Sequence, residues 1–345
     1  MSKPSLGRIV VSAPVPQPTT NFAPIWLMEA LGYAAEEGLD LHIELSGTPK
    51  DAADAVISGR GDLTFINIVF TLLARDRGVP LRPFYGFVRR QNRSFSVPRD
   101  SAISSLADLR GTTIGLYYND PELFEFARAA LRGAGINPET DVKFVPLPGT
   151  PLDAERMAAA LRDNEVQAVW QLDVFAGFMA GEGVPMRLLP APAIDRLTPS
   201  SCLNAMDANL AARPAAFAAL GRSLAKATLF TLTNPTAAVQ VMWDRYPGAA
   251  PQSAAQRKQA FKRELAALEV RVANQRIDQA PGAQWGAITE AEMVAWQEFL
   301  LETRAITTRR AVTDYYSDAF IATYNDFDPA PVVAAAHTFK VTPPE

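Results

Sequence analysis

Side chains that can hold a small molecule occur at four places in the chain, each at the carboxyl end of an expected strand or in the loop that follows it. They combine hydroxyl, amide and carboxylate groups with aromatic rings: Thr20, Asn21 and Phe22; Asn67; Tyr117, Tyr118, Asn119 and Asp120; Trp170 and Asp173. Amides donate and accept hydrogen bonds, carboxylates accept them, and aromatic rings stack on flat ligands. In open parallel sheets, ligands bind beyond the carboxyl ends of the strands, near helix N-termini. The four loops therefore indicate a binding site for a small molecule.

Structural roles also fit these residue types. The polar residues of the first and third loops are typical helix N-caps, and Trp170 can belong to the core. Tyr117 and Tyr118 point to opposite faces of their strand, so at most one of them can reach a ligand. Binding and capping both remain open from the sequence.

The usual patterns of catalysis are missing from the sequence. It contains no Walker-type phosphate loop, no Gly-x-Gly-x-x-Gly after a strand and no Gly-x-Ser-x-Gly elbow. His42, His337 and Cys202 are its only histidines and its only cysteine, which is too few for a His/Cys metal cluster. We expect a solvated or edge position for His42 and a structural role for Cys202. We therefore expect no catalytic residue, no metal site and no cofactor.

Charge and hydropathy exclude further classes of protein. The formal net charge is −4, from 33 basic and 37 acidic residues, whereas nucleic-acid-binding domains carry a basic excess. No apolar run approaches the roughly 18 residues of a membrane span. The N-terminus enters a strand without the pattern of a signal peptide, which fits a cytoplasmic protein or a mature extracytoplasmic one. We expect a monomer without nucleic-acid partners or membrane insertion.

The elements that position the four loops form two similar units. Each unit has a strand, a helix that begins with Pro and ends with Gly, and a second strand: residues 8–12, 24–38 and 39–45 in the first, and 113–116, 121–135 and 142–147 in the second. Pro is favoured at helix starts and Gly just past helix ends. This repeat predicts an α/β fold of two lobes, each with a parallel-rich sheet flanked by helices.

The remaining strands place the second lobe inside the first. They are expected at residues 63–67, 81–88, 95–97, 166–170 and 186–189, and the chain after residue 208 is expected to be mostly helical. Polar or Pro-rich stretches at 89–105 and 190–204 indicate two hinge crossings. The expected lobes are residues 1–95 with 200–345, and the inserted residues 96–199. The extra helices lie at 215–231, 235–245, 254–268 and 290–302.

Charges near the loops bear on the ligand. Asp120, Glu122 and Glu125 crowd the start of the second lobe's first helix, where they would compete with a bound anion. They favour a neutral or amino-bearing ligand, such as an aromatic heterocycle, although they can also serve only to stabilise the helix. The basic run at residues 89–93 fits a solvated crossing loop better than an anion site.

Several segments, taken in order, resemble one family. They are Phe22–Leu41 with its Glu36-Glu37-Gly38-Leu39-Asp40 run, the Gly59-Arg60-Gly61-Asp62 turn, residues 103–115, residues 302–306 and residues 314–320. They resemble solute-binding proteins of ATP-driven (ABC) importers, in the group that binds taurine, alkanesulfonates, nitrate or thiamine-pyrimidine precursors and includes fungal pyrimidine synthases. The resemblance implies a two-lobed periplasmic-binding-protein fold of type II, an extracytoplasmic location and an ABC permease as partner.

The chain departs from parts of that family. Sulfonate and nitrate binders have a small Ser/Thr-rich loop where this chain has residues 117–121, and the fungal synthases use histidine and a Cys-rich iron motif that it lacks. The resemblance thus implies a non-enzymatic binder of a thiamine-precursor-like heterocycle, held between the lobes by hinge closure. A binder of a sulfonate, nitrate or aromatic acid, or a pyrimidine-synthase-like enzyme, remains the alternative.

Overall fold

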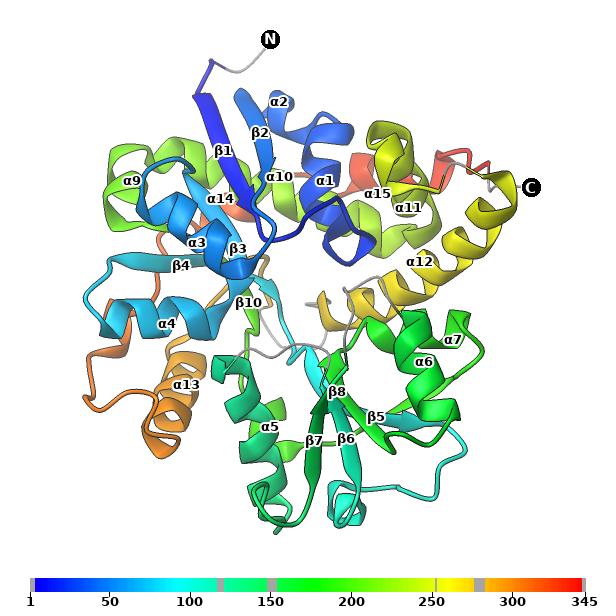
Figure 1. Ribbon diagram of the computed structural model, residues 1–345. Coiled ribbons are helices and arrows are strands. Elements are labelled where there is room, and N and C mark those ends of the chain that lie inside the picture. Colours follow the sequence, from blue (N-terminus) through cyan, green and yellow to red (C-terminus); the bar gives the residue numbers. More distant parts are fainter. Residues whose placement is uncertain (1–3, 117–120, 148–153, 252, 276–282, 343–345) are drawn as a thin grey trace. The chain divides into compact units, whose positions relative to one another are not determined.

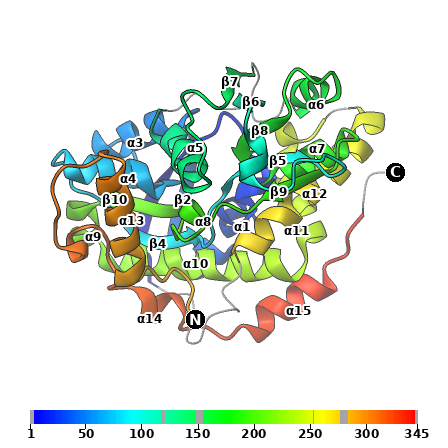
Figure 2. The same ribbon diagram turned by 90° about the horizontal axis from the view of Figure 1, so that it is seen from below.

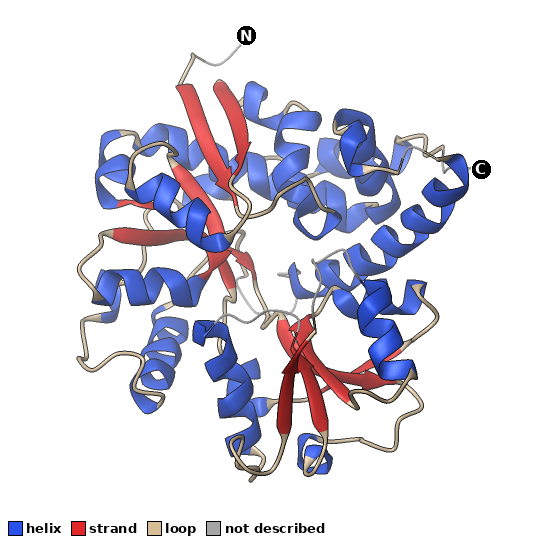
Figure 3. Cartoon of the chain, in the orientation of Figure 1, coloured by secondary structure: helices blue, strands red, loops and turns tan. Residues whose placement is uncertain are grey.

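The chain forms two compact units, each with one five-stranded sheet flanked by helices (Figures 1 and 3). The computed structural model describes residues 4–116, 121–147, 154–251, 253–275 and 283–342. Unit 1 comprises Met1–Arg89, Pro199–Arg257 and Gln275–Glu345, and unit 2 comprises Arg90–Thr198 and Lys258–Asn274. The expected α/β class with two sheets is confirmed. The sequence analysis did not foresee that residues 258–274 join unit 2.

The sheet of unit 1 has the strand order β2-β1-β3-β10-β4. Its strands are β1 (Gly7–Ala13), β2 (Leu39–Leu45), β3 (Leu63–Asn67), β4 (Leu81–Val88) and β10 (Ser201–Met206). β1 pairs in parallel with β2 and β3, whereas β10 pairs antiparallel with β3 and β4. Residues 201–204 of β10 fall within the expected crossing at 190–204, where the sequence predicted no strand. The sequence of β10, SCLNAM, has little strand propensity of its own, and pairing on both sides holds it in the sheet.

Helices surround this sheet. They are α1 (Ala23–Ala30), α2 (Tyr33–Glu36), α3 (Pro49–Ile57), α4 (Ile68–Asp76), α9 (Asp207–Ala212), α10 (Pro214–Thr233), α11 (Pro235–Arg245), α13 (Glu290–Glu302), α14 (Ile321–Tyr324) and α15 (Ala330–Thr338). The long α10 packs against α1, α11, α14 and α15, and Figure 2 shows α14 and α15 along it. The single helix expected over residues 24–38 is broken into α1 and α2. Gly32 lies between them with φ +75°, a conformation that glycine adopts without strain.

The sheet of unit 2 repeats the same plan in the order β7-β6-β8-β5-β9. Its strands are β5 (Arg93–Pro98), β6 (Thr113–Leu116), β7 (Lys143–Pro146), β8 (Ala168–Leu172) and β9 (Met186–Leu189). β6 pairs in parallel with β7 and β8, and β5 pairs antiparallel with β8 and β9. Each sheet therefore has a parallel part and one antiparallel strand, which directly follows a passage of the chain from the other unit.

The helices of unit 2 include one from the C-terminal third of the chain. They are α5 (Pro121–Gly133), α6 (Ala154–Arg162), α7 (Phe175–Gly181), α8 (Pro192–Asp195) and most of α12 (Ala254–Gln275), which lies beside α7 in Figure 1. Ala267 of α12 belongs to the hydrophobic core that includes Phe175 and Phe178 of α7. A Cβ atom on Gly177 would lie 2.4 Å from the backbone nitrogen of Ala267. The absence of a side chain at Gly177 thus lets the two helices approach closely.

Candidate functional site

The loop after β1 is held in place by its own side chains. The Thr19 hydroxyl donates a hydrogen bond to the Asn21 amide oxygen, and Trp26 Nε1 donates to the Thr19 carbonyl at 2.9 Å. Thr20 and Asn21 are buried. The N-cap position of α1 is occupied by Phe22, which makes no side-chain capping bond. Neither Thr20 nor Asn21 is therefore the cap of that helix. The capping interpretation is therefore wrong for this loop.

Phe22 forms an aromatic platform at the same edge of the sheet. Its ring centroid lies 4.8 Å from that of Phe65 in an edge-on arrangement and 6.5 Å from that of Phe87 in a stacked one. Phe65 and Phe87 are buried in β3 and β4, whereas Phe22 is partly exposed. Two buried rings therefore hold the Phe22 ring at the surface, where it can stack on a flat ligand.

Asn67 combines a structural role with unused hydrogen-bonding capacity. It ends β3 and caps α4, because its Oδ1 accepts a hydrogen bond from the Val69 backbone N–H at 3.1 Å. Its Nδ2 atom is buried and has no hydrogen-bond partner in the described part of the chain. Buried amide groups normally have a partner, so this N–H₂ group is a candidate donor to a ligand.

Of the expected site residues in unit 2, Trp170 lies in the core and four others fall outside the described residues. Trp170 in β8 is 2% exposed, with its ring centroid 4.7 Å from that of the buried Phe95. These contacts favour the structural role that the sequence left open for Trp170. Tyr117, Tyr118, Asn119 and Asp120 lie outside the described residues.

Asp173, directly after β8, is the most constrained of the expected residues. It is 2% exposed, and its Oδ1 accepts a hydrogen bond from the Val174 backbone N–H at 2.8 Å. Its Oδ1 also lies 2.8 Å from Nη2 of Arg271, and its Oδ2 accepts a hydrogen bond from Nδ2 of Asn274. The Asp173 backbone N–H donates to the Asn92 carbonyl at 2.9 Å.

Sequence reasoning missed the α12 residues of this cluster. Asn274 follows Asp173 by 101 positions, and nothing in the local sequence links the two segments. Burial lowers the pKa of the Arg271 guanidinium, and the negative charge of Asp173 opposes that shift. Nearby in β8, the buried Gln171 donates from Nε2 to the Ser96 hydroxyl at 2.7 Å, while its Oε1 has no hydrogen-bond partner among the described residues.

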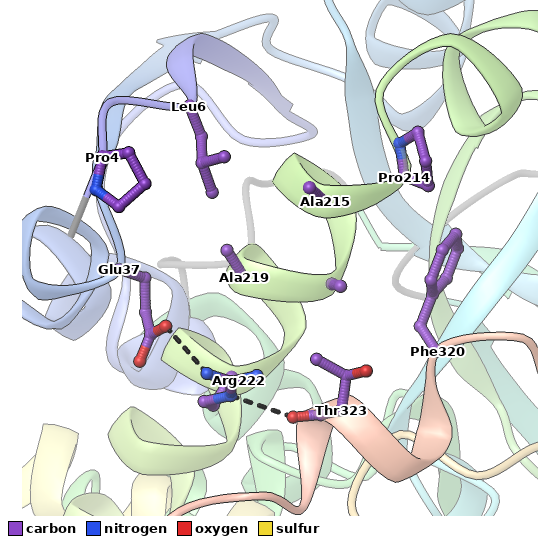
Figure 4. Close-up of a pocket in the computed structure, with 10 residues that line it drawn as sticks. Pro4, Leu6, Glu37, Pro214, Ala215, Ala219, Arg222, Phe320 and Thr323 are labelled. Carbon is purple, nitrogen blue, oxygen red and sulfur yellow. Dashed lines mark hydrogen bonds and ion pairs between the residues drawn. The ribbon is translucent and has the colours of Figure 1, made fainter.

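A pocket of about 460 Å³ opens elsewhere in unit 1 (Figure 4). Pro4 and Leu6, which line it, precede β1, so the pocket lies at the amino end of that strand, opposite the loop that follows β1. Its buried Glu37 lies 3.1 Å from Nη1 of Arg222, and Nε of Arg222 donates to the Thr323 carbonyl at 2.9 Å. The pocket is therefore separate from the expected binding loops, and its charged groups are paired.

The other residues singled out in the sequence have structural contacts. His42 lies in the edge strand β2, 3.0 Å from Oδ1 of Asp40. Cys202 is fully buried in β10, and burial raises the pKa of its thiol. Arg89 pairs with Glu292 at 2.6 Å and Arg93 is buried in β5, so the interpretation of a solvated basic loop was wrong for both.

Metal-binding groups and membrane spans were sought in the same part of the chain. Over the described ranges, no three His, Cys, Asp or Glu side chains cluster as they would around a metal ion. No helix within those ranges is both long and apolar enough to cross a membrane.

Comparisons with known proteins identify a family and relatives that are similar to this chain. A family model described as NMT1/THI5 like matches residues 19–238. The riboflavin-binding protein RibY of Chloroflexus aurantiacus is 26% identical over 234 residues, which cover 67% of this chain and 65% of RibY. The chain thus matches slightly less than two thirds of that relative's length.

Two further proteins that are similar to this chain have different named functions. A 4-amino-5-hydroxymethyl-2-methylpyrimidine phosphate synthase of Aspergillus parasiticus is 24% identical over 250 residues, or 66% of this chain and 68% of the synthase. The periplasmic aliphatic sulphonate binding protein SsuA of Escherichia coli superposes with a TM-score of 0.65 and 15% identity, covering 90% of this chain and 92% of SsuA. The structural likeness shows that the chain has the periplasmic binding protein fold.

Proposed function

The chain belongs to the NMT1/THI5-like family, and we propose that it is the solute-binding component of an ABC-type importer. Its ligand is a small aromatic or heterocyclic molecule, and its partner is an ABC permease at the outer face of the membrane. The fold it shares with SsuA supports a binding role in the periplasm. The chain works as a monomer, without nucleic acid and without turnover of the ligand.

The observation that carries this proposal is the Phe22 platform. The ring is partly exposed, is fixed by two buried rings and follows β1 at the edge where ligands of parallel sheets bind. Asn67, at the end of the neighbouring strand β3, adds an amide donor without a partner in the described chain. One stacked ring and a few directed hydrogen bonds are typical of small-molecule sites. Micromolar binding needs only about −8 kcal/mol.

The chemical class of the ligand is a separate part of the proposal. The expected neutral or amino-bearing ligand, such as a thiamine-pyrimidine precursor, rested on acids at the start of α5. One of them, Glu125, lies 2.6 Å from Arg128 and 3.8 Å from Arg132, which partly neutralise its charge. The acids at the start of α5 therefore repel an anionic ligand less than the sequence suggested, and this favours the alternative of an aromatic acid.

Calorimetry on the full chain tests the binding role. Riboflavin, 4-amino-5-hydroxymethyl-2-methylpyrimidine, benzoate and propanesulfonate are the first probes, and we expect saturable micromolar binding of at least one. Phe22→Ala should weaken that binding about two- to tenfold, because a stacked aromatic pair contributes about 0.5–1.5 kcal/mol. Phe320→Ala is the matched control, since Phe320 is also a partly exposed ring of unit 1 but lines the pocket of Figure 4. A folded protein that binds none of these probes would count against the transport role.

Hinge closure upon binding remains part of the proposal. The chain passes between the units near residues 89–90 and 198–199, within the stretches expected as hinges, and again at both ends of residues 258–274. Small-angle scattering with and without a bound probe should show a smaller radius of gyration in the complex. An unchanged radius would remove the hinge and leave the binding role intact.

The second candidate is an enzyme related to the pyrimidine phosphate synthases. The similarity to the Aspergillus parasiticus synthase over 66% of this chain favours it. Mass spectrometry after incubation with iron(II) and air distinguishes the two functions. A binding protein returns with unaltered mass, whereas an iron-dependent covalent change at a lysine or histidine would favour the enzyme.

A further inference from the structure

We infer that Arg271 binds an acid group of the ligand, a carboxylate or a sulfonate, and that Asp173 is the positioning residue that holds Arg271 in place. This inference rests on the proposed binding function and adds the chemical class of the ligand. Both residues belong to unit 2. The sequence analysis named Asp173 as a ligand-binding residue but did not connect it with Arg271.

Arg271 is a buried cation with unused donors. Its side chain is 0% exposed, and within the described ranges its single charged contact joins Nη2 to Asp173 Oδ1, at 2.8 Å. Nε, Nη1 and Nη2 make no hydrogen bond to any residue in the described ranges. A guanidinium carries five N–H donors, and buried polar groups of folded proteins nearly always have partners. The unmet donors of Arg271 therefore call for an acceptor that the described chain does not supply.

Asp173 differs from Arg271 because its carboxylate is already satisfied. Its carboxylate accepts hydrogen bonds from the Val174 backbone N–H and from the Asn274 side chain, and its own backbone N–H donates to the Asn92 carbonyl. These contacts fix the carboxylate against α12 and leave it little capacity for a ligand. Asp173, which we expected to bind the ligand directly, is thus better suited to orient the guanidinium.

The location of the pair fits a ligand site. Asp173 directly follows β8, which pairs in parallel with β6, and ligands of such sheets bind beyond the carboxyl ends of the strands. Two neighbours add further unmet capacity: the Oε1 of Gln171 and the Oδ1 of Asn92 are buried acceptors without hydrogen-bond partners among the described residues. A ligand that has both an acid group and an N–H or O–H group would satisfy both kinds of atom.

The chemistry of the donor favours an acid over a neutral ligand. The planar guanidinium matches the two oxygens of a carboxylate or sulfonate, and charge-assisted hydrogen bonds are about twice as strong as neutral ones. Among the described residues, the Arg271 guanidinium contacts one carboxylate oxygen, which leaves a second edge of the group for another oxyanion. The pair with Asp173 by itself leaves the three guanidinium nitrogens without a hydrogen-bond acceptor in the described part of the chain.

Matched acids and amides test the inference on the full chain. Benzoate and benzenesulfonate are titrated by calorimetry against benzamide and benzenesulfonamide, and we expect saturable binding of an acid at least tenfold tighter than that of its amide. The double variant Asp173→Asn/Arg271→Met removes the charge pair as a unit and avoids an unpaired buried charge. It should bind the acid at least tenfold more weakly. Arg271→Lys keeps Asp173 paired but lacks the planar guanidinium that can bind two oxygens at once, so it should bind the acid with intermediate affinity. It is the test variant to use if the double variant does not fold.

The control is an ion pair of unit 1 that joins the buried Glu37 to the partly exposed Arg222. Glu37→Gln/Arg222→Met removes the pair with a 3.1 Å contact beside the pocket of Figure 4 and should leave acid binding unchanged. The inference is overturned if no acid binds saturably, or if wild type, Arg271→Lys and the double variant bind it equally. If a neutral heterocycle binds where the acids do not, the inference fails while the proposed function stands. If no solute binds at all, both fail.

Discussion

Substitution of Gly177 by alanine should destabilise unit 2 through the contact between α7 and α12. A Cβ atom at this position would lie 2.4 Å from the Ala267 nitrogen and 2.5 Å from the Ala266 carbonyl carbon, whereas ordinary contact begins at 3.4 Å. The backbone of α12 must therefore move by about 1 Å. Backbone atoms of a helix cannot rotate out of the way, so the shift affects the whole docked segment.

The magnitude follows from two opposing terms. Overpacking of a filled core costs about 1–3 kcal/mol, and a clash with helix backbone belongs at the upper end of that range. Replacement of glycine by alanine inside a helix returns up to about 1 kcal/mol. The net loss in the free energy of unfolding is therefore about 2 kcal/mol. Arg271 should also be displaced, because α12 carries it towards Asp173.

Urea denaturation followed by circular dichroism measures this loss, and hydrogen exchange locates it in α7 and α12. Gly181→Ala is the matched control in the same helix, since its Cβ would lie 3.1 Å from Cγ and 3.2 Å from Cβ of Arg263, a tight contact but no clash with helix backbone. We expect that control to change the free energy of unfolding by less than about 1 kcal/mol. Equal stability of Gly177→Ala and wild type would show that α12 does not pack against α7 as described.

Two further perturbations have defined outcomes. Asp173→Ala leaves the buried Arg271 without its carboxylate partner and should lower the free energy of unfolding by about 3–5 kcal/mol, as measured by urea denaturation. The double variant Asp173→Asn/Arg271→Met should lower it much less, because no unpaired charge stays buried. Equal losses in the two variants would contradict a buried charge pair. Burial, followed by the charge of Glu36, raises the pKa of Tyr33 to about 12, so its contribution to stability is present below about pH 10 and is lost as the pH rises to about 12. Thermal unfolding between pH 9 and 12 should therefore show a smaller decline for Tyr33→Phe than for wild type, and parallel curves would refute this assignment.

The sequence by itself determined where several strands of both sheets begin and end. The bounds expected for β2, β3, β4, β6 and β9 agree with the structure, because alternating or continuous apolar residues between Gly, Pro and polar turns are local signals. The family and the edge of the sheet that carries Phe22 and Asn67 follow from the same local patterns. These features need no knowledge of which distant residues meet.

Only the tertiary structure decided the elements whose identity depends on distant partners. β10 is a strand because β3 and β4 pair with it on both sides, although SCLNAM has no strong strand signal. Residues 258–274 join unit 2 because Gly177 leaves room for α12. The same packing brings Arg271 to Asp173, from a segment about a hundred positions further along the chain. Sequence patterns report the local surroundings of a residue, whereas a buried charge pair arises only when two distant elements pack together.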